Sequence, residues 1–189
     1  FFERQEIKHA LAYLRLMANP EDDGALLRVI NFPTRGIGAR SIESIQSNAR
    51  LSGASLWQAT CAGGGRSGAA LANFVNLIER LRSETQQMTQ AEQIEHMLEH
   101  SGLRAFYQAE KDGEERLENL NELTNAAVNY LAEADDRSLT GFLSHASLEA
   151  GEHHRRRRRG RQAEREQRHQ RSGGGSVVGC FGSRDALDR

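Results

Sequence analysis

The segment best suited to bind a ligand is a glycine-containing stretch, residues 31–38, between two helical patterns. Its Gly-apolar-Gly turn lets the backbone come close to a surface, because glycine has no Cβ to obstruct approach. The turn also directs free backbone N–H groups outward at the start of the next helix, where the helix dipole favours an anion. A phosphate group suits that place. The candidate phosphate-binding residues are Thr34, Arg35, Gly36, Ile37, Gly38 and Arg40.

Two interpretations of this turn stay open from the residues alone. In the first, the N–H groups, the Thr34 hydroxyl and the guanidinium groups of Arg35 and Arg40 donate to backbone phosphates. Such contacts position a protein on DNA without reading its sequence. In the second, the glycines only allow two helices to pack closely.

No catalytic residue, metal site or cofactor site is predicted in this chain. It lacks a G-x-x-x-x-G-K-[ST] phosphate loop, and its glycine-rich stretch 63–68, predicted to be a flexible connector, has no lysine to reach ATP phosphates. Cys61 and Cys180 lie far apart without metal-ligand spacing, which indicates reduced thiols and a cytoplasmic location. No stretch approaches the ~20 apolar residues of a membrane span, so no membrane partner is expected.

The elements that would position the turn are helices, because apolar residues recur at steps of three and four through residues 1–149. The fold class is therefore all-α, a multi-helix bundle. Helices are predicted over 3–18, 22–31, 39–51, 69–84, around 117–131 and from Leu139. Capping boxes are predicted at Ser55 with Gln58 and at Thr89 with Glu92, a C-terminal cap at Ser101-Gly102, and an N-cap at Ser138.

The chain divides by charge after Glu152. Residues 1–152 carry 14 Lys+Arg against 22 Asp+Glu, a net charge of −8, while residues 153–189 carry 11 against 4, a net charge of +7. The second segment contains an unbroken arginine run from Arg155 to Arg159 and no apolar face. We therefore predict a helical domain, 1–152, and a disordered Arg/Gly-rich tail, 153–189.

The origin of this tail has three explanations. A frame-shifted end in a GC-rich gene is favoured, because arginine codons abound in the other frames of such genes and the tail contains no lysine. A genuine basic arm and a joined artefact are the alternatives. The start at Phe1, without Met, similarly indicates an internal piece of a longer protein.

Several blocks in residues 1–152 resemble UvrD-like superfamily 1 DNA helicases, the group that includes UvrD, Rep and PcrA. Residues 1–8 and 12–16 look like the segment that enters the inserted subdomain called 2B, and residues 33–38 match its GIG element, a helix-hairpin-helix-like contact to duplex DNA. Blocks at 56–59, 101–104, 118–123 and 142–149 follow in family order. His9 departs from the pattern, since the family usually has Asp there.

The resemblance implies that the parent protein is an ATP-dependent 3′→5′ helicase acting in DNA repair or replication. ATP and Mg²⁺ would bind to the parent's motor domains, which are the implied protein partners, while 2B swivels on the motor and grips duplex DNA without sequence preference. A stand-alone helical DNA-binding or protein-interaction module is the alternative function, and a helical scaffold without a nucleic-acid role is a third. Because residues 1–152 are acidic, any DNA contact must be local.

Overall fold

The structure is a computed structural model that describes residues 1–150, and the predicted tail, 153–189, lies outside the described residues. Within residues 1–150 every regular element is helical, which confirms the all-α prediction. The elements are α1 (Gln5–Ala18), α2 (Asp23–Val29), α3 (Ala39–Ser52), α4 (Leu56–Cys61), η1 (Gly65–Ser67), α5 (Gly68–Glu84), α6 (Gln90–His100), α7 (Leu103–Gln108), α8 (Gly113–Glu133) and a helix over 139–150.

The predicted helix boundaries hold because the start and stop signals act locally. Both capping boxes form: the Ser55 hydroxyl accepts from the Gln58 N–H at the start of α4, and Thr89 and Glu92 make the same reciprocal pair at α6. The Ser138 hydroxyl accepts from the N–H of Gly141 at 3.0 Å and caps the last helix as predicted. These pairs satisfy N–H groups that a helix leaves free at its start.

Two features of the fold differ from the sequence predictions. The short helix α7 was not predicted; it begins directly after Gly102, whose φ of 83° is in the left-handed region that favours glycine. The stretch 63–68 was predicted to be a connector only, but Gly65–Ser67 form a 3₁₀ turn that leads into α5. Both elements are too short to show a helical period in the sequence.

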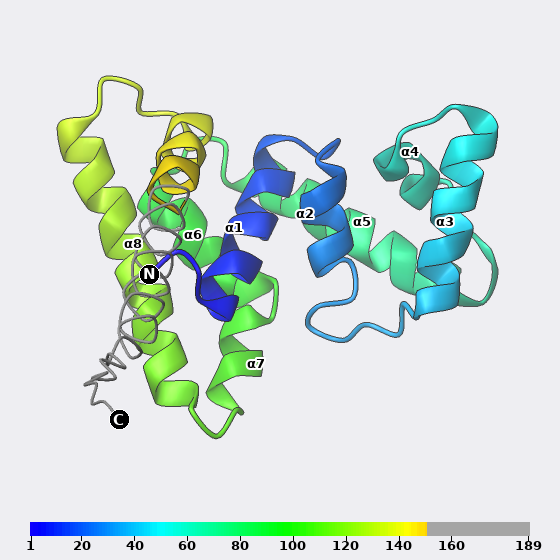
Figure 1. Cartoon of the computed structure of the whole chain (residues 1–189), viewed down its shortest axis with the longest axis horizontal. Helices are drawn as coiled ribbons and strands as arrows, with labels where there is room; N and C mark the ends of the chain where they lie inside the picture. Colours follow the sequence, from blue (N-terminus) through cyan, green and yellow to red (C-terminus); the bar gives the residue numbers. More distant parts are fainter. Residues whose placement is uncertain (151–189) are drawn as a thin grey trace, which may run out of the picture. The chain divides into compact units, whose positions relative to one another are not determined.

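Within the fold of residues 1–150, helix α1 is central and packs against α2, α5, α6 and α8 (Figure 1). Helix α5 runs from α4 toward α6, so α3 and α4 lie at one end of it and α6 to α8 at the other (Figure 1). The α2–α3 loop, residues 30–38, therefore connects the helices around α1 to the α3–α4 pair. No helix within residues 1–150 is long and apolar enough to cross a membrane.

The core forms from the apolar faces of these helices. Each large side chain that leaves water contributes about 1.5–3 kcal/mol. The largest fully buried ones are Tyr13, Tyr107, Phe74, Phe142, Ile7, Leu14, Leu16, Leu26, Ile30, Ile37, Leu71 and Ile78. Trp57 is also buried, and Tyr130 packs against the core. The α2–α3 loop is thus anchored on a packed scaffold.

Candidate nucleic-acid interface

The α2–α3 loop turns its glycines outward and its isoleucine inward. Ile37 is 0% exposed and belongs to the core, while Gly36 and Gly38 are exposed. Gly36 has a φ of 82°, a conformation that other residues rarely adopt. Gly38 has extended backbone, with φ −79° and ψ 172°, and an added Cβ would meet no atom of the described chain within 4 Å. The loop therefore presents bare backbone to solvent at Gly38.

Asn31 fixes the shape of this loop. Its Oδ1 atom accepts hydrogen bonds from the N–H groups of Arg35, at 2.8 Å, and Ile37, at 3.1 Å. Those two N–H groups are consequently satisfied inside the protein and do not face a ligand. One side-chain oxygen that holds two alternate N–H groups makes the turn rigid before any ligand arrives.

Backbone N–H groups without an acceptor lie at the start of α3, directly after Ile37. Within residues 1–150, the backbone N–H groups of Gly38, Ala39 and Arg40 have no hydrogen-bond acceptor, and all three residues are exposed. The first turn of α3 contains no acidic residue, and Gly38 as N-cap supplies no side-chain acceptor. The positive end of this helix is therefore uncompensated, which favours an anion there.

Arg35, one of the predicted phosphate contacts, is instead committed to the protein's interior. Its Nη1 donates to the carbonyl oxygens of Pro33, at 2.9 Å, and Val29, at 3.3 Å. Its Nη2 donates to the Tyr13 hydroxyl, at 2.6 Å, and the Ser101 carbonyl, at 2.8 Å. Four of the five N–H donors of a guanidinium are thus used within the fold. The expectation of a freely available Arg35 guanidinium is corrected by this arrangement.

Aromatic rings complete the surroundings of Arg35. Its guanidinium carbon lies 5.8 Å from the Tyr13 ring centre and 5.7 Å from that of Phe74, within range of cation–π attraction. The Tyr13 hydroxyl in turn donates to the Phe32 carbonyl at 2.6 Å. Burial raises the pKa of Tyr13 to about 12, so this hydroxyl stays protonated and remains a donor. Arg35 therefore connects the loop to α1, to α5 and to the C-terminal end of α6.

Thr34 and Arg40 lie where the sequence predicts, at the surface. Both side chains are exposed, and neither takes part in a hydrogen bond or ion pair with another described residue. They remain available to a ligand beside the free N–H groups of α3. The structure thus separates the six predicted residues into an exposed set, Thr34, Gly36, Gly38 and Arg40, and an internal set, Arg35 and Ile37.

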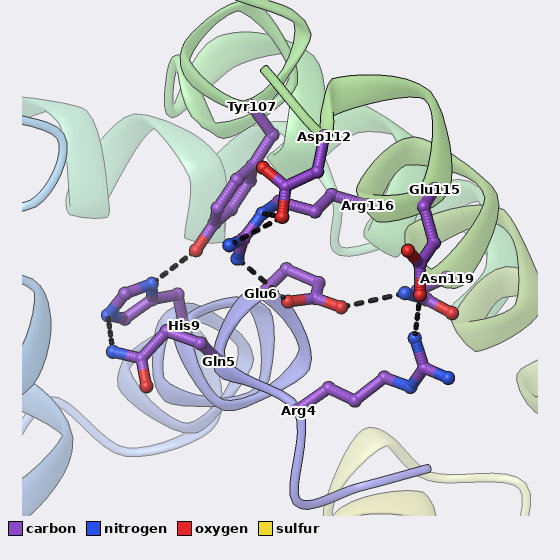
Figure 2. A network of polar contacts seen from close by, with 9 residues as sticks. All are labelled: Arg4, Gln5, Glu6, His9, Tyr107, Asp112, Glu115, Arg116 and Asn119. Carbon is purple, nitrogen blue, oxygen red and sulfur yellow. Dashed lines mark hydrogen bonds and ion pairs between the residues drawn. The ribbon is translucent and has the colours of Figure 1, made fainter. Parts of the chain in front are cut away.

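A polar network that contacts the loop at Phe32 was not predicted from the sequence. His9, 5% exposed, stacks on Phe32 with ring centres 3.7 Å apart, and its Nδ1 lies 2.6 Å from the Tyr107 hydroxyl. Its Nε2 lies 3.3 Å from the amide nitrogen of Gln5. Since that nitrogen is a donor, one neutral tautomer with the proton on Nδ1 fits both contacts. Figure 2 shows His9 on α1 facing Tyr107 on α7.

The same network continues to α8 through a buried carboxylate. Glu6, 4% exposed, accepts from Asn119 at 2.8 Å and from Arg116 at 3.3 Å (Figure 2). Arg116 also pairs with Asp112, at 2.9 Å, and lies over the Tyr107 ring. Because a buried charge is costly unless it is paired and hydrogen-bonded, these contacts fix how α1 meets α8. Through Arg116 and Tyr107 they also join α7 to α8.

Positive charge is concentrated in the part of the chain that carries the loop. Residues 24–68 contain five arginines and one glutamate, a net charge of +4. Residues 1–23 and 69–150 together contain nine basic and twenty acidic residues, a net charge of −11. An anionic ligand is therefore attracted to residues 24–68 and repelled by the rest of residues 1–150, most strongly by the acidic helices α6 and α8.

Comparison with known proteins identifies the family to which this chain is similar. The model of the family described as the UvrD-like helicase C-terminal domain matches residues 1–162. DNA helicase II of Escherichia coli K12 is 45% identical over 163 residues, covering 80% of this chain and 23% of the relative. DNA helicase II of Haemophilus influenzae is 47% identical over 163 residues, covering 80% and 22%.

A more distant relative gives the same picture. The ATP-dependent DNA helicase PcrA of Bacillus subtilis is 36% identical over 157 residues, covering 79% of this chain and 21% of the relative. The chain thus spans between a fifth and a quarter of the length of these curated relatives. The family match extends over most of the chain, and the chain belongs to the UvrD-like helicase C-terminal domain family.

Proposed function

We propose that residues 1–150 are the 2B subdomain of a UvrD-type, ATP-dependent 3′→5′ DNA helicase and that they grip the sugar-phosphate backbone of duplex DNA. Family membership supports the helicase assignment. The position of the glycine turn between α2 and α3, as in a helix-hairpin-helix, supports the contact with duplex DNA. ATP and Mg²⁺ would act in the motor domains of the parent protein, and those domains are the proposed protein partners.

The observation that carries the proposal is the exposed start of α3. Three free N–H groups at Gly38, Ala39 and Arg40 point to an anion, and the Arg40 side chain and the Thr34 hydroxyl add donors beside them. These groups donate to phosphate oxygens, which are the same for every base pair. The contact therefore positions the protein on a duplex without sequence preference.

The acidic remainder of residues 1–150 limits how the duplex is held. A net charge of −11 outside residues 24–68 repels a polyanion, so the contact stays small and sensitive to salt. A weak, sequence-independent grip suits a subdomain of a motor that must move along DNA, because a tight contact would have to be broken at every step.

The substitution Gly38→Ala tests the proposal. The backbone at Gly38 is extended and the space around its Cβ position is empty, so the fold tolerates alanine, but the methyl group occupies the place of an approaching phosphate. We expect duplex affinity to fall roughly tenfold at about 0.1 M salt, the effect of losing one phosphate contact. Fluorescence anisotropy with a labelled duplex measures it.

The matched control is Gly24→Ala, since Gly24 is exposed on α2 and an added Cβ would make only an ordinary contact, 3.6 Å from Asp22. Both variants are compared in a chain ending at Glu152, because nine arginines between residues 155 and 171 would bind any polyanion. Circular dichroism verifies that the helices form. Equal duplex affinity of the two folded variants would show that the turn only packs helices.

A further inference from the structure

The beginning of the α2–α3 loop is held by aromatic rings from two other helices. Phe32, partly buried, stacks on His9 of α1 with ring centres 3.7 Å apart and an angle of 27° between the ring planes. Phe106 of α7 meets the Phe32 ring edge-on, with ring centres 4.7 Å apart. The loop is therefore attached to α1 and α7 through Phe32 before it reaches its glycines.

Helix α1 contacts Phe32 at two points. His9 and Tyr13 lie four positions apart, so their side chains are neighbours on one face of the helix. The His9 ring contacts the Phe32 ring, and the Tyr13 hydroxyl donates to the Phe32 carbonyl at 2.6 Å. Together the ring contact and the backbone bond fix both the place of Phe32 and the direction in which the chain leaves it.

The His9 ring is itself fixed in its orientation. Both of its nitrogens have a partner, Tyr107 for Nδ1 and Gln5 for Nε2 (Figure 2), and the residue is 5% exposed. Turning the ring away from Phe32 would break the buried bond to the Tyr107 hydroxyl, which is costly. The stack on Phe32 is therefore formed before any ligand arrives.

The position of Phe32 determines that of Asn31, its neighbour in the chain. The Asn31 Oδ1 atom accepts from the N–H groups of Arg35 and Ile37, and Gly38, the N-cap of α3, follows directly. A displacement of Phe32 therefore moves the acceptor that shapes the turn. The free N–H groups at the start of α3 move with it.

We infer that His9 is a positioning residue for the proposed duplex contact: without touching DNA, it holds the start of α3, through Phe32 and Asn31, in the place that receives a phosphate. The inference rests on the proposed function and adds a residue of α1 to it. The competing arrangement is that Arg35 and Asn31 suffice, because Arg35 bonds to four acceptors of the fold. His9 would then be an ordinary core residue.

The substitution His9→Ala distinguishes these arrangements. It leaves a space beside Phe32, and packed side chains relax toward such a space, so the loop settles in a new position. We expect the N–H of Ile37 to exchange with solvent faster, because its bond to Asn31 opens more often. Duplex affinity should fall, because DNA must restore the original loop. Both effects should be roughly two- to tenfold, the range of a single aromatic contact.

The measurements use amide NMR on the whole chain of 21.1 kDa. The exchange rate of the Ile37 amide is measured without DNA, and duplex affinity is read from the Gly38 amide during titration with a short blunt duplex at about 0.1 M salt. Residues 151–189 are the same in every variant, so a difference between variants reports the loop. Circular dichroism verifies that each variant forms its helices.

His9→Phe is the rescue variant, since it keeps a ring against Phe32 and loses the bond to Tyr107. Both quantities should stay within about twofold of the unsubstituted protein. Leu123→Ala is the matched control for lost core packing: Leu123 is buried on α8, which packs against α1, α6 and α7. It should lower the stability of the fold and leave Ile37 exchange and duplex affinity unchanged.

Unchanged affinity in folded His9→Ala, with or without faster Ile37 exchange, would overturn the inference and leave the proposed function standing. Equal losses in His9→Ala and His9→Phe would exclude the stack on Phe32 as the cause, and equal losses in Leu123→Ala would reduce His9 to general stability; either result overturns the inference. If DNA does not shift the Gly38 signal of the unsubstituted protein, the proposed duplex contact fails, and the inference that rests on it fails too.

Discussion

Arg35 connects parts of the chain that the sequence places far apart. Its guanidinium contacts Tyr13 on α1, the carbonyl of Ser101 after α6 and the ring of Phe74 on α5. Two further bonds, to Val29 and Pro33, hold it against its own loop. A planar group with donors in fixed directions can satisfy these acceptors together, which a lysine ammonium cannot. Arg35 therefore holds the turn to the rest of the fold, while Asn31 fixes the shape of the turn itself.

We predict that Arg35→Ala destabilises the protein by about 2–4 kcal/mol, because it removes charge-assisted bonds to buried acceptors and leaves them unsatisfied. Urea denaturation followed by circular dichroism measures the free energy of unfolding. Arg40→Ala is the control, because Arg40 is exposed and has no partner in residues 1–150. Its effect should stay within about 0.5 kcal/mol. Equal stability of the two variants would contradict the structural role of Arg35.

At the scale of helices, His9 joins α1 to α7. Burial lowers its pKa from 6.5 to about 4, with the positive charge of Arg28 acting in the same direction. The imidazole is therefore neutral in the folded protein at pH 7, and this form bonds to Tyr107 and stacks on Phe32. Protonation would place a charge between two aromatic rings, where burial and Arg28 oppose it more than Glu6 favours it.

Stability should consequently fall as the pH is lowered from 6.5 to about 4. In this window the unfolded chain binds a proton at His9 and the folded protein does not, so the free energy of unfolding decreases by up to about 1.4 kcal/mol per pH unit. The contribution is fully present above pH 6.5 and fully lost below about pH 4. Urea unfolding at a series of pH values measures the slope.

His9→Asn provides the comparison, since asparagine keeps a polar side chain and does not titrate. The variant starts from a lower stability but should show a flatter curve between pH 6.5 and 5, while carboxylates such as Glu92 and Asp112 contribute equally to both proteins. Parallel curves for the two proteins would mean that His9 is not the titrating group in this window.

The sequence predicts the helices better than the contacts between them. Capping boxes and apolar stripes act within a few residues, so the start of α6 at Thr89 and the face of α5 around Phe74 could be read directly. The role of Arg35 could not be predicted, because its partners Tyr13 and Ser101 lie 22 and 66 positions away. A signal for the polar network was present: Glu6 and His9 lie beside the apolar face of α1.

At the scale of residues 1–150, charge divides the chain into two parts. The +4 segment, residues 24–68, carries the α2–α3 loop, and the rest of residues 1–150 carries −11, with the acidic helices α6 and α8 in it. The exposed start of α3 and the charge of each segment could be predicted from the sequence, but the packing of α4 against α3 required the fold, because no local pattern specifies it. The field of the acidic helices limits where a duplex can lie.

We therefore predict that duplex DNA slows backbone hydrogen exchange in α3 and in residues 63–68, and leaves α6, α7 and α8 unchanged. The free N–H groups at Gly38–Arg40 and Gly64–Arg66 exchange readily without DNA, because they have no acceptor in the described part of the chain, and a bound phosphate would protect them. Mass spectrometry of peptides from the DNA-bound and free protein measures the difference. Raising the salt should abolish the protection, because counterions then compete with the arginines for phosphate. Protection centred on α6 or α8 would contradict an interface set by the +4 segment, since those helices carry the acidic residues that repel a polyanion.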